Sequence, residues 1–173
     1  IYYRISDQSY TKVKLPGATK EFCFRNFISC FPNADLTIIA DNCSEETCQM
    51  LKNITQAEVL KTSLSNAGSF RFALDLALQL PPLTPVYFVE DDYLHFRGNT
   101  EFGNFQPAQI IQEGLTQAQY VTLFDHPDKY ESEFQYGEVK RCFRTSSIHW
   151  RETIATCMTF ATTVWQLQDR KST

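Results

Sequence analysis

The 173-residue sequence lacks several patterns, and each absence excludes a class of protein. It has no signal peptide and no run of about 18 apolar residues, so we expect no membrane segment in the chain and a cytoplasmic location. It also lacks an excess of positive charge. A formal net charge of −4 and a pI near 5.4 argue against binding nucleic acid or a membrane surface through bulk electrostatics. An anionic ligand therefore needs a local binding device.

Three short motifs are missing as well. The sequence contains neither G-x-G-x-x-G nor G-x-x-x-x-G-K-[ST], which excludes a dinucleotide-binding dehydrogenase and a phosphate-loop NTPase. The six cysteines form no C-x-x-C pair and are too sparse for a secreted disulfide scaffold. We therefore expect reduced thiols that pack as small apolar side chains.

The sequence does contain a normal share of hydrophobic residues, 43%, and it is rich in aromatics, with 14 Phe and 8 Tyr. A chain of this length can bury a core without disulfides or metals. We predict a single domain over 1–173.

Short apolar runs alternate with helical patterns along the chain. Strands are predicted at 1–5, 35–40, 57–61, 86–90 and 120–124. Helices are predicted around Phe24, Phe27, Ile28 and Phe31, from a Ser44 cap through Leu51, over 66–80, and from Pro107 onward. A loop is predicted over 96–105. Residues 125–147 are irregular, with a hairpin as the alternative, and 153–167 fits either a strand or a helix. The alternation predicts an α/β fold with an open, mostly parallel sheet.

Polar residues follow all five predicted strands. They are Ser6, Asp7, Gln8 and Ser9; Asp41, Asn42 and Ser44; Ser63, Ser65 and Asn66; Glu90, Asp91 and Asp92; and Asp125, His126 and Asp128. Open α/β sheets bind ligands beyond the carboxyl ends of their strands, so these positions are candidates for a site. The alternative for most of them is ordinary loop polarity.

The stretch "PVYFVEDDYLH" ends a buried strand with three adjacent carboxylates, Glu90, Asp91 and Asp92. Carboxylates this close repel one another, so a positive charge is expected beside them. Their hard oxygens suit Mg²⁺ or Mn²⁺, which leave coordination positions for phosphate oxygens. A helix cap or a solvated turn is the structural alternative.

The stretch "SNAGSFRFALD" predicts a helix start that attracts negative charge through its free N–H groups. Asn66 precedes the helix, and Gly68 leaves room for a ligand near the backbone. Arg71 either reaches a phosphate or pairs with Asp75 one turn later.

The order of the first strand, "IIADNCS", "NAGSFRFAL" and "VYFVEDD" resembles the nucleotide-sugar-binding half of glycosyltransferases with the A-type fold, a Rossmann-like nucleotide-diphospho-sugar transferase fold with helices on both faces of the sheet. The resemblance covers residues 1–95 well, and it implies a shortened acceptor-side half over 96–173.

By this resemblance Asp41 is the acid beside the nucleoside, and Asn66 and Gly68 lie near the donor. Glu90, Asp91 and Asp92 match the D-x-D-like motif, although its first position is Glu rather than Asp. The resemblance makes Asp92 the metal ligand and Asp91 a ribose partner. The remaining candidates are Ser6 and Arg71 for the nucleotide and His149 as a second metal ligand, for which a packed or surface histidine is the alternative.

The implied reaction transfers a sugar from a nucleoside diphosphate donor, UDP above all, to a hydroxyl acceptor with Mn²⁺ or Mg²⁺. An inverting enzyme also needs a carboxylate base, and Asp169 is the first candidate and Asp125 the second. A retaining enzyme needs no such base.

Two other functions stay open. A nucleotidyltransferase of related fold usually has a Gly-rich signature after its first strand, whereas "SDQSYTKVKLPGATK" has only Gly17. The other alternative is a glycosyltransferase-like domain that binds nucleotide or glycan without turnover, or that serves as an interaction scaffold.

Overall fold

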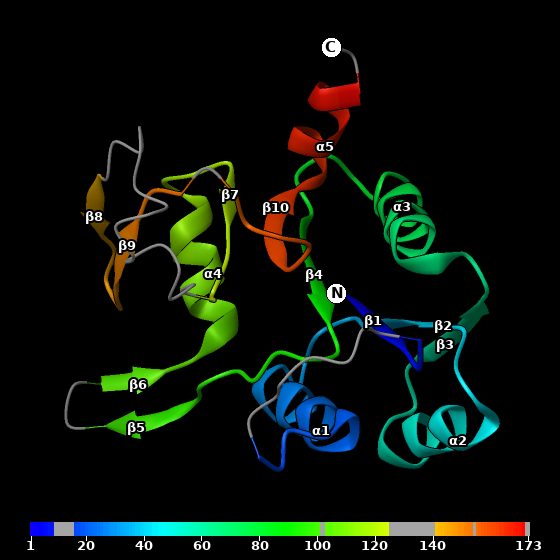
Figure 1. The fold of residues 1–173 in the computed structure, drawn as a ribbon. Coiled ribbons are helices and arrows are strands. Elements are labelled where there is room, and N and C mark those ends of the chain that lie inside the picture. Colours follow the sequence, from blue (N-terminus) through cyan, green and yellow to red (C-terminus); the bar gives the residue numbers. More distant parts are fainter. Residues whose placement is uncertain (9–15, 101–102, 125–140, 154, 172–173) are drawn as a thin grey trace, which may run out of the picture.

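The structure is a computed structural model that describes residues 1–8, 16–100, 103–124, 141–153 and 155–171 (Figure 1). Its main sheet has six strands in the order β3-β2-β1-β4-β10-β7. Four of them run parallel, namely β1 (Tyr2–Ser6), β2 (Thr37–Asp41), β3 (Glu58–Thr62) and β4 (Pro85–Glu90). Strand β10 (Phe160–Thr163) pairs antiparallel with both β4 and β7 (Tyr120–Val121). The predicted α/β class and the mostly parallel sheet are confirmed.

The helices are α1 (Lys20–Cys30), α2 (Glu45–Ile54), α3 (Ser65–Ala77), α4 (Pro107–Leu115) and α5 (Val164–Lys171). Two antiparallel hairpins lie outside the sheet, β5 (Gly98–Thr100) with β6 (Gly103–Phe105) and β8 (Cys142–Arg144) with β9 (His149–Arg151). None of the helices in the described ranges is long and apolar enough to cross a membrane.

Helices cover both faces of the sheet, as predicted. Figure 1 shows α1 and α2 below the strands and α3 and α5 above them. Successive side chains of a strand point to opposite faces. Tyr3 and Ile5 therefore pack in the core between the sheet and the helices α1, α2 and α4. Tyr2 instead joins Phe88 and Phe160 in a second core cluster against α3 and α5. The two faces of one sheet therefore have separate cores.

Local signals account for the helix starts. The Ser44 side chain caps α2 by accepting a hydrogen bond from the Thr47 N–H at 3.2 Å, as predicted. Helix α1 is capped in the same way by Thr19, which accepts from the Phe22 N–H at 3.1 Å. Helix α4 begins with Pro107, as its sequence predicted.

Three predicted segments differ from the structure. The strand predicted over 120–124 is only Tyr120–Val121. Its partner β10 begins at Phe160, and the pairing of the two strands ends at Ala161 and Val121. The loop over 96–105 contains the β5–β6 hairpin, whose short Gly- and Asn-containing strands lack an apolar pattern. The ambiguous stretch 153–167 contains both elements, since β10 is followed directly by α5.

The chain order creates a switch point beside β1. From β1 the chain builds β2 and β3 on one side, and it then returns to place β4 on the other side. The carboxyl ends of these four parallel strands share one edge, which we call the carboxyl edge. Strand β10 runs the other way, so α5 begins at the opposite, amino edge, where the Val164 N–H donates to the Thr84 carbonyl at 3.1 Å.

All six cysteines are free thiols. Cys23, Cys30 and Cys48 are buried in the core, as predicted. The predicted packing as small apolar side chains is wrong for Cys142 and Cys157, which are exposed.

Candidate functional site

The carboxyl edge brings four of the predicted site residues together. In the strand register Ser6 lies opposite Asp41, and Glu90 lies opposite Arg4. The Ser6 N–H donates to the Asp91 carboxylate at 3.3 Å, which joins the ends of β1 and β4 directly. Because the switch point lies between these two strands, the general rule for open α/β sheets makes this the expected position of a ligand. We call Asp7, Asp41, Glu90, Asp91 and Asp92 the acidic edge.

Glu90 and Asp91 point to opposite faces of the sheet, and each meets a cation. Glu90 lies on the α3 face, where its carboxylate is 3.5 Å from the Arg4 guanidinium. Asp91 lies on the α1 face, where its carboxylate is 3.8 Å from the Lys20 amine. The positive charge expected beside the acidic triplet is therefore supplied in part by the chain itself.

Arg4 holds several elements in place at this edge. It is only 6% exposed. Its guanidinium donates to the Asn66 amide oxygen at the start of α3 and lies 5.2 Å from the centre of the Phe70 ring. It also contacts the Met158 sulfur at 3.4 Å. Burial lowers the pKa of Arg4, and the nearby Glu90 opposes that change. Arg4 thus fixes the predicted residues Glu90 and Asn66 relative to β1.

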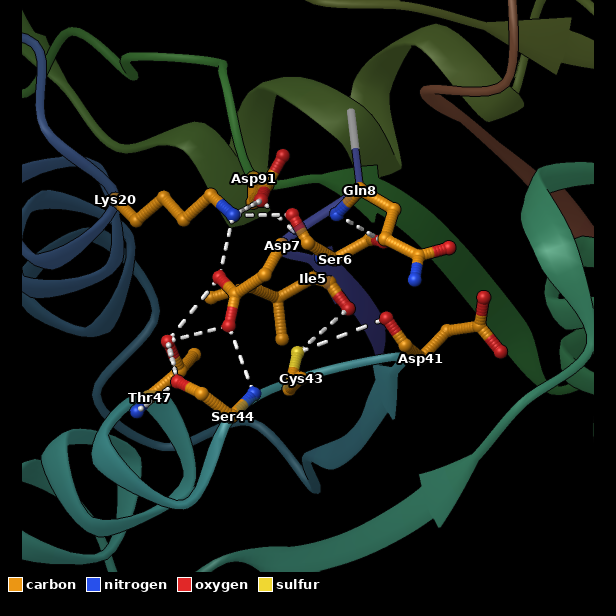
Figure 2. A network of polar contacts seen from close by, with 10 residues as sticks. All are labelled: Ile5, Ser6, Asp7, Gln8, Lys20, Asp41, Cys43, Ser44, Thr47 and Asp91. Atoms are coloured by element: carbon orange, nitrogen blue, oxygen red, sulfur yellow. Dashed lines mark hydrogen bonds and ion pairs between the residues drawn. The ribbon is translucent and has the colours of Figure 1, made fainter. Parts of the chain in front are cut away.

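Lys20 and Asp7 form the corresponding network on the other face (Figure 2). The Lys20 amine is 2.7 Å from Asp7 and also donates to the Ser6 carbonyl. Asp7 accepts further hydrogen bonds from the Ser44 N–H at 2.8 Å and from the Thr47 hydroxyl at 2.9 Å. Burial acts to raise the pKa of Asp7, but these hydrogen bonds outweigh it and lower the pKa to about 2. Asp7 is therefore a fixed anion that joins the loop after β1 to α2.

Asp41 connects β2, β3 and the start of α3. It is 2% exposed, and one carboxylate oxygen accepts from the Thr62 hydroxyl at 2.8 Å and from the Leu64 N–H at 2.6 Å. The other oxygen accepts from the Asn42 amide at 2.9 Å. These contacts give Asp41 a positioning role within the chain. A contact with a nucleoside stays a prediction.

The start of α3 carries Asn66, Gly68 and Arg71. Asn66 is bound to Arg4, as described. A side chain on Gly68 would come 2.9 Å from the Leu64 Cβ, so the tight first turn of the helix itself accounts for the glycine. Arg71 is exposed on the same helix and takes part in none of these contacts.

The structure does not bring the remaining candidates to the acidic edge. Asp169 is exposed on α5, which begins at the amino edge beside the start of β4 (Figure 1). His149 is exposed on β9 and lines a cavity that none of the acidic-edge residues lines. Asp125 lies outside the described residues, as do His126 and Asp128. Within the described residues, no group of three or more His, Cys, Asp or Glu side chains is arranged around a metal position.

That cavity, of about 570 Å³, lies next to the acidic edge. It is lined by residues that follow β4 and β7, by α4 and by the β8–β9 hairpin. Tyr93, the residue directly after Asp92, forms part of its wall, and the Tyr93 ring packs against Phe124 with ring centres 5.0 Å apart. Burial raises the pKa of Tyr93, and the charges of Cys157, Glu90 and Asp92 raise it further. Tyr93 therefore links the wall of the cavity to the acidic edge.

Sequence reasoning missed Arg4, Lys20 and the role of Asp7. Arg4 does leave a signal, because it is a charged residue inside the apolar run "IYYRI" and a buried charge needs partners. Lys20 leaves none, since its distance along the chain from Asp91 says nothing of their contact.

Comparison with known proteins found no matching family model, curated protein or solved structure. A function for this chain therefore has to be inferred from the geometry of the acidic edge.

Proposed function

We propose that this protein is a metal-dependent glycosyltransferase that transfers a sugar from a nucleoside diphosphate donor, UDP in the first instance, to a hydroxyl acceptor. We further propose that its sheet is an A-type glycosyltransferase fold. One observation carries the proposal: the acidic edge lies at the switch point between β1 and β4, the position where open α/β sheets bind nucleotides.

The balance of charge at this edge supports a divalent cation. Among the described residues, Arg4 and Lys20 contact the acidic edge, and both already pair with its carboxylates. Carboxylates this close together repel a diphosphate unless a cation accompanies it. Carboxylate oxygens are the ligands that Mg²⁺ and Mn²⁺ prefer, so the chemistry of these side chains suits the ions, although within the described residues no three of them surround a metal position.

Asp92, with Asp91 beside it, would hold the cation. The ion would supply stabilisation of the charge that develops on the diphosphate leaving group. The chain's own residues fix the site in advance. Arg4 sets the position of Glu90 and Asn66, and the N–H of Ser6 and the amine of Lys20 orient Asp91. Such pre-organisation lowers the barrier because the charges need not rearrange during transfer.

Thermal unfolding with UDP tests the proposal. UDP with Mn²⁺, at about 100 times its Kd, should raise Tm by about 7 °C, because a ligand at that ratio stabilises by about 2.7 kcal/mol. UDP without metal should give little or no shift. Asp92→Asn should remove the effect, whereas Asp75→Asn, at an exposed position of α3, should keep it. No shift for the unaltered protein with UDP, ADP or GDP in either Mn²⁺ or Mg²⁺ would refute the proposal.

A binding domain without turnover is a second candidate, and one observation favours it. Asp169 lies on α5 at the amino edge, so the described residues provide no carboxylate base from that helix at the acidic edge. Donor hydrolysis distinguishes the two functions. A protein that shows the metal-dependent UDP shift but releases no UDP from UDP-glucose, UDP-galactose or UDP-N-acetylglucosamine is a binder.

A further inference from the structure

We propose that the cavity beside Tyr93 binds the acceptor, and that this acceptor is a neutral carbohydrate. The inference rests on the proposed function and adds the class of the second substrate. A transferase must hold both substrates in contact, so the acceptor has to lie directly beside the donor site. The cavity meets this requirement, because Tyr93 forms part of its wall and directly follows Asp92 of the acidic edge.

The size and walls of the cavity suit a small sugar. Its volume of about 570 Å³ lies within the range of small-molecule sites. Its walls include the aromatic rings of Tyr93, Phe96, Phe124 and Trp150. Phe96 and Phe124 are 67% and 40% exposed, so their rings offer apolar surface to a ligand. The flat apolar faces of sugar rings can pack against such rings, while their hydroxyls meet polar groups at the rim.

His95 borders the cavity from the side of the core. It is one of the lining residues and is only 8% exposed. The Asn26 side-chain amide makes two hydrogen bonds with the His95 backbone. Its oxygen accepts from the His95 N–H at 2.7 Å, and its nitrogen donates to the His95 carbonyl at 2.9 Å. One ring nitrogen, Nε2, lies 2.8 Å from the Tyr87 hydroxyl. The other, Nδ1, is buried and has no hydrogen-bond partner among the described residues.

An unpaired buried polar atom is unfavourable, but Nδ1 is enclosed by protein and a ligand in the cavity does not reach it. Burial lowers the pKa of His95 to about 4, so the ring is neutral near pH 7 and offers one donor and one acceptor.

The charges around the cavity favour a neutral ligand. The adjacent acidic edge contains five carboxylates, which disfavour a second anion at short range. Among the described lining residues, Arg151 and Glu152 contribute one charge of each sign. A neutral sugar meets no net charge from this pair, whereas a uronic acid would be repelled by the acidic edge.

Ligand-detected NMR tests the inference with UDP and Mg²⁺ present, because Mg²⁺ is diamagnetic and does not broaden the signals of the probes. The probes are methyl β-galactoside, methyl β-glucoside and lactose, with methyl β-glucuronide as the anionic comparison, each at up to about 10 mM. At least one neutral probe should bind. Phe124→Ala and Phe96→Ala should each weaken it about fivefold by removing an aromatic contact, and UDP affinity should not change. Phe22→Ala is the matched control, because Phe22 is 54% exposed on α1 and does not line the cavity.

The outcomes separate the two proposals. If the protein binds UDP with metal but no neutral probe, or if the glucuronide binds as well as the neutral sugars, the inference about the cavity is overturned. Equal weakening by Phe22→Ala and Phe124→Ala would overturn it too. If neutral probes bind and respond to Phe124→Ala but no nucleotide binds, the cavity stands as a carbohydrate site, while the glycosyltransferase proposal fails.

Discussion

The two edges of the main sheet differ sharply in character. At the carboxyl edge, acids are paired with Arg4 and Lys20, and two non-glycine residues adopt left-handed backbone conformations, Asn42 with φ 51° and Ser65 with φ 65°. At the amino edge, where β4 begins and β10 ends, Leu83 is 84% exposed and Trp165 is 51% exposed. Backbone strain and buried charge persist only where surrounding contacts enforce them. The carboxyl edge is therefore the more constrained of the two edges, and this makes it the better candidate for a site.

The difference between the two edges predicts that substitutions at the carboxyl edge lower the free energy of unfolding more than substitutions at the amino edge. Arg4→Ala should lower the free energy of unfolding by about 3 kcal/mol, because it leaves the partly buried Glu90 and the Asn66 amide without their cation. Leu83→Ser at the amino edge should change it by no more than about 0.5 kcal/mol, since the side chain is already in solvent. Urea denaturation measures both values.

Arg25→Ala provides a matched control for the loss of an arginine. Arg25 pairs with Glu21 on α1 at 2.8 Å, but both side chains are more than half exposed. Its loss should cost about 0.5 kcal/mol. Equal effects of Arg4→Ala and Arg25→Ala would contradict the view that Arg4 holds the edge together.

Asp7 should make the carboxyl edge sensitive to acid. Its folded pKa of about 2 lies below its usual value of 3.8, so its ionised form stabilises the fold above the usual value and loses that effect as the pH falls toward 2. Asp7 is partly exposed, so solvent screening reduces the contribution to about 1 kcal/mol at neutral pH.

The stability difference between the unaltered protein and Asp7→Asn should therefore be about 1 kcal/mol at pH 6 and should vanish between about pH 4 and pH 2. Urea denaturation at several pH values measures it. In a Lys20→Met background the difference should be smaller, because one of the hydrogen-bond donors to Asp7 is absent. A difference that does not change with pH would show that Asp7 is not the fixed anion described above.

Much of this edge was predictable from the sequence, since apolar runs followed by polar residues identify strand ends. The runs ending near Ser6, Asp41 and Glu90 are strands in the structure, and they place those residues together. The partners of the acids were not predictable in the same way. Lys20 reaches Asp91 across 71 positions of sequence, and only the packing of α1 against β1 and β4 makes that contact.

The part after residue 95 was harder to predict for a physical reason. Its strands are short, and β7 has only two residues, so no periodic pattern can build up. The direction of β10 could not be predicted from its sequence, because "FATT" fits a parallel or an antiparallel strand equally well. That direction determines at which edge of the sheet Asp169 lies. If β10 ran parallel to β4, α5 would begin at the carboxyl edge and Asp169 would lie near the acids.

The smallest expected effect is also the most direct test of the two edges. Asp169→Asn should leave the stabilisation of the fold by UDP and Mn²⁺ unchanged within about 0.5 kcal/mol, whereas Asp92→Asn should abolish it. The six residues of β4 span about 17 Å, which exceeds the screening length of about 8 Å at physiological salt. Turnover should be equally insensitive to Asp169→Asn. If that variant binds UDP normally but no longer transfers sugar, then α5 acts at the carboxyl edge during catalysis, and the separation of the two edges does not hold in the working protein.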